Sequence, residues 1–251
     1  MAADVGAVEP PTEPTATTVW CYGDSLTEGW SRNDATGGMA FYPYADWLPE
    51  ASGGRLQGKC CGVSGELTRE ILRRLRRHLE EVGSDVRGHF VVLLGGTNDL
   101  ARGYTAEHVL ANLQDMATLV VDSGARPVFV TVPPLGARFG VADGARAAAL
   151  RSVLNAGIRA LTATEGGGGR TFLDAPVVEL HDAVAVPRVE AVAVTGRQVE
   201  DEDARSAVYP VFSPPCDADG LHMTRAGYQL LARMVSDAVL HCIATARAAP
   251  A

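Results

Sequence analysis

The sequence has no long hydrophobic segment and no excess of positive charge. Its longest uninterrupted apolar run is Phe90 to Leu94, far below the roughly 20 residues that a membrane-spanning helix needs. Lysine and arginine number 22 against 30 aspartate and glutamate residues, which gives a net charge of −8. Such a charge repels nucleic-acid phosphates and anionic lipid surfaces. We therefore expect a soluble protein with no membrane span and no nucleic acid as its main partner.

Cysteine is scarce and irregularly spaced. The five cysteines are an odd number, Cys60 and Cys61 are adjacent, and no spacing matches a disulfide scaffold or a zinc site. Residues 1–17, rich in alanine, proline, threonine and acidic side chains, lack the basic start and apolar core of a secretion signal. These absences predict a disordered N-terminal tail, a reducing compartment with the cytoplasm as the location, and no metal.

The remaining composition is that of a globular protein. Its 251 residues are 47% hydrophobic and 21% charged, enough to bury one sizeable core. We expect a single domain over residues 18–247. No repeat of 20 to 50 residues recurs, which excludes a solenoid.

Short apolar runs alternate with amphipathic segments along this domain. The expected strands, each too short and too uniformly apolar for a surface helix, are Val19 to Tyr22, Phe90 to Leu94, Val128 to Val132 and Thr171 to Leu173, with a weaker one at Arg55 to Cys60. The expected helices are Glu66 to Val82, one capped by Thr105 and ending near Ser123, one preceded by Asp143 and running to about Thr164, and a last one capped by Thr224. This alternation predicts an α/β protein with a buried parallel sheet, whose chemistry gathers at the carboxyl ends of the strands.

The first of these helices is rich in arginine. Leucine and isoleucine recur every four residues along it, while the other faces carry Arg69, Arg73, Arg76 and Arg77. These arginines suggest either an anion site or a solvated helix face, and we favour the solvated face.

The first strand runs directly into Gly23-Asp24-Ser25-Leu26, which places Ser25 at the mouth of the sheet and at the start of a helix. Backbone N–H groups at a helix start can stabilise a developing oxyanion, so a nucleophilic serine gains from that location. The alternative is that Ser25 or Asp24 only caps the helix.

Two further predicted strands end in glycine, and at one of these ends an asparagine follows. The third strand ends in Gly95-Gly96-Thr97-Asn98-Asp99, where glycine allows close ligand approach and the Asn98 amide is a neutral donor suited to an oxyanion hole. An ordinary turn explains the same residues. Gly62 follows the second strand and by itself indicates nothing.

Asp219 and His222 lie three residues apart just before the last helix. A carboxylate at that spacing can accept the Nδ1 proton of the imidazole, which leaves Nε2 free to take a proton from a serine. The other five histidines lack such a partner pattern, so His222 is the candidate base.

Together these segments resemble the SGNH hydrolases, also called the GDSL esterase and lipase superfamily. The matching blocks are Gly23-Asp24-Ser25-Leu26, Gly62, Gly96-Thr97-Asn98-Asp99 and Asp219-Gly220-Leu221-His222, in the order of that superfamily. The resemblance implies a flavodoxin-like three-layer α/β/α sandwich with a five-stranded parallel sheet, and a hydrolase without metal or organic cofactor. It implies Ser25 as nucleophile, His222 as base and acid, Asp219 as the partner of His222, and an oxyanion hole from Ser25, Gly62 and Asn98.

The substrate is less well defined by the sequence. We expect a small-molecule ester, with small acyl, aryl or lipid esters, an O-acetylated carbohydrate, and transfer to another acceptor all open. An aromatic group after Ser25 either lines a substrate pocket or packs the core: Trp30, Phe41, Tyr42, Tyr44 and Trp47. A non-catalytic binding module would not require the whole constellation, and a nucleotide or flavin binder lacks the expected glycine-rich loop.

One segment, from about 181 to 216, is longer than a plain crossover needs. We predict a hairpin near Val189 to Val194, followed by a loop that either borders the site or is a solvated excursion. Oligomeric state is not indicated by any pattern.

Overall fold

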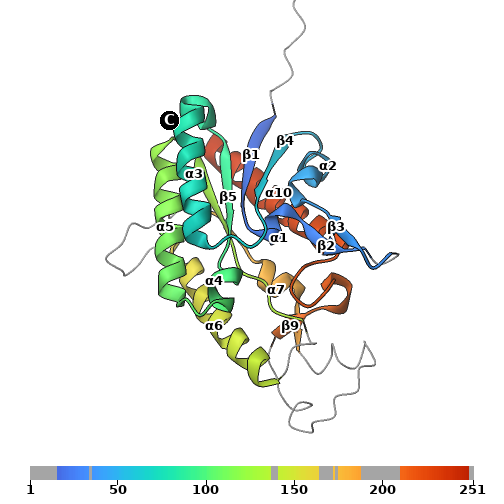
Figure 1. The fold of residues 1–251 in the computed structure, drawn as a ribbon. Helices are drawn as coiled ribbons and strands as arrows, with labels where there is room; N and C mark the ends of the chain where they lie inside the picture. Colours follow the sequence, from blue (N-terminus) through green and yellow to red (C-terminus); the bar gives the residue numbers. More distant parts are fainter. Residues whose placement is uncertain are drawn as a thin grey trace, which may run out of the picture.

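A parallel sheet forms the centre of the protein (Figure 1). This computed structural model describes residues 16–33, 36–136, 141–163, 172, 175–187 and 210–248. The sheet has five parallel strands in the order β4-β1-β5-β6-β7, which is the flavodoxin-like order. Their bounds are β1 Thr17–Gly23, β4 Leu56–Gly62, β5 Phe90–Leu94, β6 Arg126–Val130 and β7 Val177–Val178. The predicted fold class is therefore confirmed.

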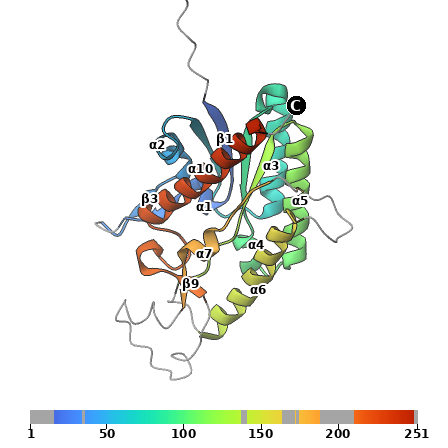
Figure 2. The same cartoon turned by 180° about the vertical axis from the view of Figure 1, so that it is seen from behind.

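Helices cover both faces of the sheet and produce two cores. On one face lie α3 (Thr68–Val82), α5 (Ala106–Asp122) and α6 (Val141–Ala160), whereas α10 (Arg225–Ala248) crosses the other face (Figures 1 and 2). Alternation along β1 shows the division, since Val19 and Cys21 pack towards α10 and Tyr22 packs towards α3 and α5. A strand buried on both faces must be apolar throughout.

Short elements complete the described part of the chain. They are α1 Ser25–Glu28, β2 Trp30–Arg32, β3 Met39–Phe41, η1 Tyr44–Trp47, α2 Leu48–Ala51, η2 Gly83–Val86, α4 Thr97–Ala101, α7 Leu180–Val184, β8 Ala185–Pro187, β9 Pro210–Phe212 and η3 Pro214–Cys216. The strands β2 and β3 pair antiparallel, as do β8 and β9. Within the described residues, no helix has the length and apolarity needed to cross a membrane.

The strand predicted at Thr171 to Leu173 falls mostly outside the described residues, since of these three residues only Phe172 is described. Phe172 itself is in no strand, and its ring packs against that of Phe129, with ring centroids 5.9 Å apart. The edge strand of the sheet is Val177–Val178 instead. A run of three residues has no periodicity from which a strand can be predicted.

The strand predicted at Val128 to Val132 begins and ends two residues earlier, at Arg126–Val130. Val132, the last residue of the predicted strand, is buried, but it does not pair with a neighbouring strand of the sheet. Val132 N donates to Asn155 Oδ1 (2.8 Å) and Val132 O accepts from Asn155 Nδ2 (3.0 Å). A side chain of α6 thus satisfies the backbone where a neighbouring strand is missing.

The helix starts agree better with prediction. Thr105 caps α5 by accepting from His108 N, and Thr224 Oγ1 accepts from Gly227 N at the start of α10. Helix α6 begins at Val141, so Asp143 lies inside the helix that it was expected to precede, and the helix ends at Ala160 rather than near Thr164. Of the expected tail, residues 1–15 lie outside the described residues, and β1 already begins at Thr17. The hairpin predicted near Val189 to Val194 also lies outside them.

Candidate active site

The chain turns sharply where β1 leads into α1. Gly23 ends the strand, and a Cβ there would come within 2.3 Å of Leu94 O, so only glycine fits beside β5. Asp24 caps α1, because its Oδ1 accepts from Leu26 N at 2.9 Å. Ser25 is thereby the first residue of a helix that begins at the carboxyl end of a central strand.

Three side chains from the two ends of the chain form a hydrogen-bonded line. Ser25 Oγ lies 2.9 Å from His222 Nε2, and His222 Nδ1 lies 3.0 Å from Asp219 Oδ2. Because an ionised carboxylate only accepts, Nδ1 carries the proton donated to Asp219, and the neutral ring accepts the Ser25 hydroxyl proton at Nε2. The structure thus brings together the serine, histidine and aspartate that the sequence singled out.

Asp219 is held as a charged acceptor. Burial alone would raise its pKa, but hydrogen bonds from the His222 ring and from the amides of His222 (2.8 Å) and Leu221 (2.9 Å) lower the pKa of this carboxyl below its ordinary value. This carboxylate acceptor at Nδ1 orients the His222 ring so that Nε2 faces Ser25.

The β2 strand braces the loop that carries His222. Ser31 Oγ donates to Met223 O at 2.8 Å, and Tyr228 Oη of α10 donates to Trp30 O at 2.6 Å. The Trp30 ring lies against the imidazole of His222, with centroids 4.2 Å apart and planes inclined by 45°. Residues almost 200 positions apart therefore position the imidazole over Ser25.

Gly62 lies directly against α1. It pairs with Gly23 in the parallel ladder, and a Cβ at Gly62 would come within 2.1 Å of Glu28 N. The end of β4 thus lies against the C-terminal part of α1, the helix that begins with Ser25.

Asn98 lies at the start of α4 and is already engaged. Its Nδ2 donates to Glu66 O at 2.9 Å and to Asp24 Oδ2 at 3.3 Å. The amide therefore reaches the same corner of the sheet as Ser25 and Gly62, but its two protons have protein acceptors. A ligand oxygen would have to replace the longer of these contacts.

Asp24 is a feature of the site that sequence reasoning weighed only as a cap. Its side chain is buried, and loss of solvation raises its pKa to about 7, with Asp99 and Glu66 adding repulsion. The sequence does not indicate this raised pKa, because the identity of a residue does not show whether its carboxyl group faces water or is buried against Asn98.

Asp99 was likewise missed, and it fixes the helix that carries Asn98. It is fully buried, its Oδ2 accepts from Thr68 N (3.0 Å) and its Oδ1 accepts from Thr68 Oγ1 (2.7 Å). Asn112 Nδ2 donates to the same hydroxyl at 2.9 Å. These bonds join α3, α4 and α5 beneath the site.

The aromatic residues after Ser25 have two different environments in the structure. Tyr44 is fully buried and Tyr42 and Trp47 pack against the α10 core. Trp30 instead contacts His222, and its ladder partner Phe41 is 46% exposed. Within this aromatic group, Trp30 thus contacts His222, and Phe41 lies beside it on β3.

No group of three or more histidine, cysteine, aspartate or glutamate side chains suited to a metal occurs in the part of the chain that the structure describes. All five cysteines are free thiols.

Solved structures with the same fold come from several bacteria. A carbohydrate acetylesterase family member from Sinorhizobium meliloti has a TM-score of 0.62 and 20% identity, with 91% of this chain and 99% of that chain covered. A GDSL-like lipase from Bacteroides thetaiotaomicron has a TM-score of 0.59 and 20% identity over 93% and 92% of the two chains. A member of the lipolytic G-D-S-L family from Veillonella parvula has a TM-score of 0.61 and 16% identity over 88% and 97%.

A comparison with curated protein sequences finds no match. The profile of the GDSL-like lipase/acylhydrolase family matches residues 21–230, which include every residue of the site described above. This chain therefore belongs to the GDSL-like lipase/acylhydrolase family and is a carboxylic ester hydrolase.

Proposed function

We propose that Ser25 is the nucleophile of an esterase that works through an acyl-enzyme. Ser25 Oγ attacks the ester carbonyl carbon while His222 Nε2 takes its proton, and Asp219 stabilises the resulting imidazolium. Collapse of the tetrahedral intermediate breaks the bond to the alcohol, which leaves with the proton from His222. Water then attacks the acyl group by the same route and releases the acid.

The oxyanion hole in this proposal consists of the backbone N–H groups of Ser25 and Gly62 and the side chain of Asn98. Their support is the convergence of β1, β4 and α4 at one corner of the sheet. As negative charge develops on the carbonyl oxygen, the Asn98 amide exchanges its 3.3 Å contact with Asp24 for the oxyanion. Removing one preorganised donor of this kind raises the activation barrier by about 2.7–4 kcal/mol.

The observation that carries the proposal is the continuous line from Ser25 through His222 to Asp219, with distances of 2.9 and 3.0 Å. A non-catalytic binding module would gain nothing from a serine aimed at an imidazole whose tautomer is fixed. A complete set of side chains for acyl transfer also leaves no step that requires a metal or an organic cofactor.

For the substrate we propose small acyl or aryl esters. The support is the half-exposed Phe41 beside Trp30 and the 41% exposed Val63, which directly follows Gly62, since both offer apolar surface close to the line of three side chains. O-acetylated carbohydrate is the second candidate, because similar folds include a carbohydrate acetylesterase. Transfer to an acceptor other than water uses the same site, and the five free thiols support a reducing, cytoplasmic setting.

A fluorophosphonate probe tests the assignment of the nucleophile. We expect one rapidly labelled serine, identified by mass spectrometry as Ser25, because activation needs His222 within reach. Ser25→Ala and His222→Ala should abolish rapid labelling, whereas Ser152→Ala, an exposed serine of α6, should leave it unchanged. Rapid labelling that survives Ser25→Ala would contradict the proposal.

The substrate class is tested by nitrophenyl esters of increasing acyl length alongside acetylated sugars. We expect the highest kcat/KM among short acyl or aryl esters, and a preference for acetylated sugars would favour the second candidate. Chelators should leave activity unchanged, and an inhibition that added metal reverses would contradict a metal-free mechanism.

A further inference from the structure

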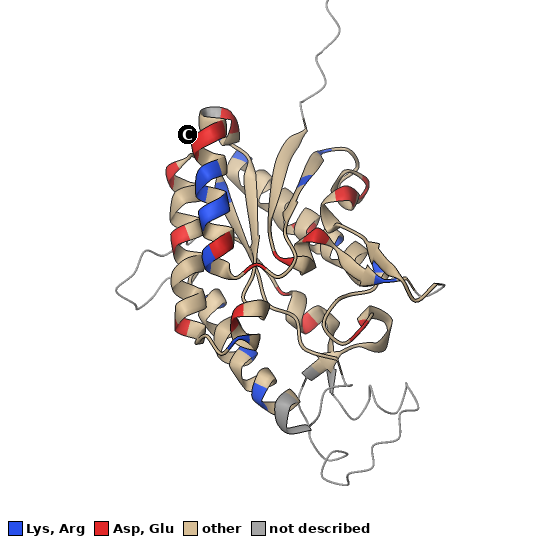
Figure 3. Ribbon diagram, in the orientation of Figure 1, with Lys and Arg blue, Asp and Glu red and all other residues tan. Residues whose placement is uncertain are grey.

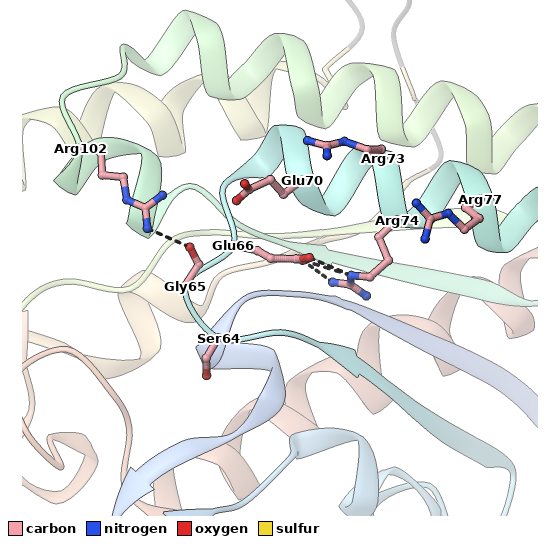
Figure 4. A pocket seen from close by; sticks show the side chains of 8 residues that line it. All are labelled: Ser64, Gly65, Glu66, Glu70, Arg73, Arg74, Arg77 and Arg102. Carbon is pink, nitrogen blue, oxygen red and sulfur yellow. Dashed lines mark hydrogen bonds and ion pairs between the residues drawn. The ribbon is translucent and has the colours of Figure 1, made fainter.

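Three arginines of α3, Arg73, Arg74 and Arg77, line a cavity. A cavity of about 540 Å³ opens between α3 and the loop after β4, and neither Ser25 nor His222 lines it (Figure 4). Its charged lining consists of four arginines and two glutamates, a net charge of +2 in a chain of net charge −8: Arg73, Arg74, Arg77, Arg102, Glu66 and Glu70. Figure 3 shows the same concentration of basic residues on α3.

The two glutamates do not neutralise this cavity. Glu66 is paired with Arg74, whose Nη2 lies 2.6 Å from Oε2. The same Nη2 donates to the Gly23 carbonyl at the end of β1, and Nη1 donates to the Cys61 carbonyl near the end of β4. Glu70 Oε2 accepts from Leu67 N at 2.9 Å and so serves the start of α3. Both carboxylates are thereby committed to the protein.

Two guanidinium groups of this cavity have no ion-pair partner among the described residues. In that part of the chain the guanidinium groups of Arg73 and Arg77 make no hydrogen bond or ion pair, and the guanidinium group of Arg102 bonds only the Gly65 carbonyl, at 3.3 Å. Arg73 and Arg77 lie four residues apart on α3, a spacing at which like charges destabilise a helix. An anion between them would remove that repulsion.

We propose that this cavity binds an oxyanion with more than one negative charge, a phosphate or sulfate group, either free or attached to a larger molecule. The guanidinium fork fits the tetrahedral oxygens of such groups and keeps its charge at every physiological pH. The cavity also adjoins the site, because Glu66 lines the cavity with its side chain while its carbonyl holds Asn98 Nδ2. An anionic group on an ester substrate would be held beside the loop whose Glu66 carbonyl accepts from Asn98, the proposed oxyanion donor.

Isothermal titration with inorganic phosphate tests the binding. We expect the Arg73→Gln/Arg77→Gln variant to bind phosphate at least about tenfold more weakly than the wild type, because two charge-assisted contacts are lost. The matched control is Arg69→Gln/Arg76→Gln, which makes the same change of net charge on the same helix outside the cavity lining. It should change the affinity by less than about twofold, since long-range charge effects are screened in 0.1 M salt.

Kinetics with matched esters, one neutral and one carrying a phosphate group, distinguish the two sources of the anion. If the anion is part of the substrate, phosphate competes with the charged ester only and the Arg73→Gln/Arg77→Gln variant loses kcat/KM for that ester alone. If the anion is a free ligand, phosphate binding should have the same effect on the hydrolysis of both esters.

No phosphate binding by the wild type, or an equal loss in both double variants, would overturn the proposal. The titration does not depend on Ser25, so either result leaves the assignment of the hydrolytic site to its own test.

Discussion

Asn98 Nδ2 donates to Oδ2 of Asp24 across 3.3 Å, so the amide proposed to bind the oxyanion rests on a buried carboxyl group. The same carboxyl caps α1 through its other oxygen, and α1 begins with Ser25. One buried side chain thus links the helix of the nucleophile to a donor 74 positions away along the chain.

Asp24 is predicted to make stability depend on pH. Because burial raises its pKa to about 7, the folded protein retains a proton that the unfolded chain releases above about pH 4. The contribution of Asp24 to the free energy of unfolding therefore falls as pH rises from about 4 to 7, by up to roughly 1.4 kcal/mol per unit. Asp24→Asn removes this loss, so its stability relative to wild type should rise between pH 5 and pH 7.

Urea denaturation at pH 5 and pH 7 measures this change. Glu107→Gln is the control, because the pKa of this exposed carboxyl at the start of α5 is lowered and its stabilisation is lost only in the acid range. Its stability difference from wild type should be the same at both pH values. A constant difference for Asp24→Asn as well would show that Asp24 is ionised throughout this range.

Asn98→Ala should reduce kcat by roughly 10²–10³-fold with a much smaller change in KM. The reason is that the amide is proposed to bind the oxyanion of the transition state rather than the ground-state ester. Steady-state kinetics with a nitrophenyl ester give both constants, and thermal unfolding checks that the loss of bonds to Glu66 and Asp24 has not unfolded the site. An effect confined to KM would make Asn98 a substrate contact instead.

Gly62→Ala should displace α1 and suppress activity. The added Cβ would lie 2.1 Å from Glu28 N and 2.6 Å from Thr27 C, and these backbone atoms cannot rotate aside as a side chain can. We expect a destabilisation of about 1–3 kcal/mol, typical of overpacking, together with slower fluorophosphonate labelling of Ser25. Gly38→Ala is the control, because its Cβ would meet only the Thr36 hydroxyl at 3.3 Å. Equal effects of the two substitutions would argue against a close approach at Gly62.

Phe41→Ala should lower kcat/KM for aryl esters more than for a minimal ester such as methyl acetate. Phe41 is 46% exposed beside Trp30, so its removal costs substrate contact of about 1–3 kcal/mol and little folding energy. Met39→Ala, an exposed apolar residue of the same strand, is the control and should leave the ratio unchanged. An unchanged ratio for Phe41→Ala would place the substrate away from β3.

Much of the architecture follows from local patterns in the sequence. The uniformly apolar run at Phe90 to Leu94 coincides with β5, and Thr105 and Thr224 stand where their helices begin. The spacing of Asp219 and His222 also determines their bond, because a tight turn brings a carboxylate within reach of an imidazole three residues later. These features depend on residues a few positions apart, so the amino-acid order is sufficient to predict them.

Other features exist only because distant segments meet. The edge strand Val177–Val178 is set by pairing with β6, and the contact of Trp30 with His222 depends on how α10 docks. Asp24 beside Asn98, and the cavity that joins Arg102 to the arginines of α3, likewise require the parallel register of β1, β4 and β5. Burial and pairing across a sheet arise from three-dimensional packing, which periodicity along the chain does not encode. The tertiary structure alone therefore decided which charges are buried, which are left unpaired, and which residues surround Ser25.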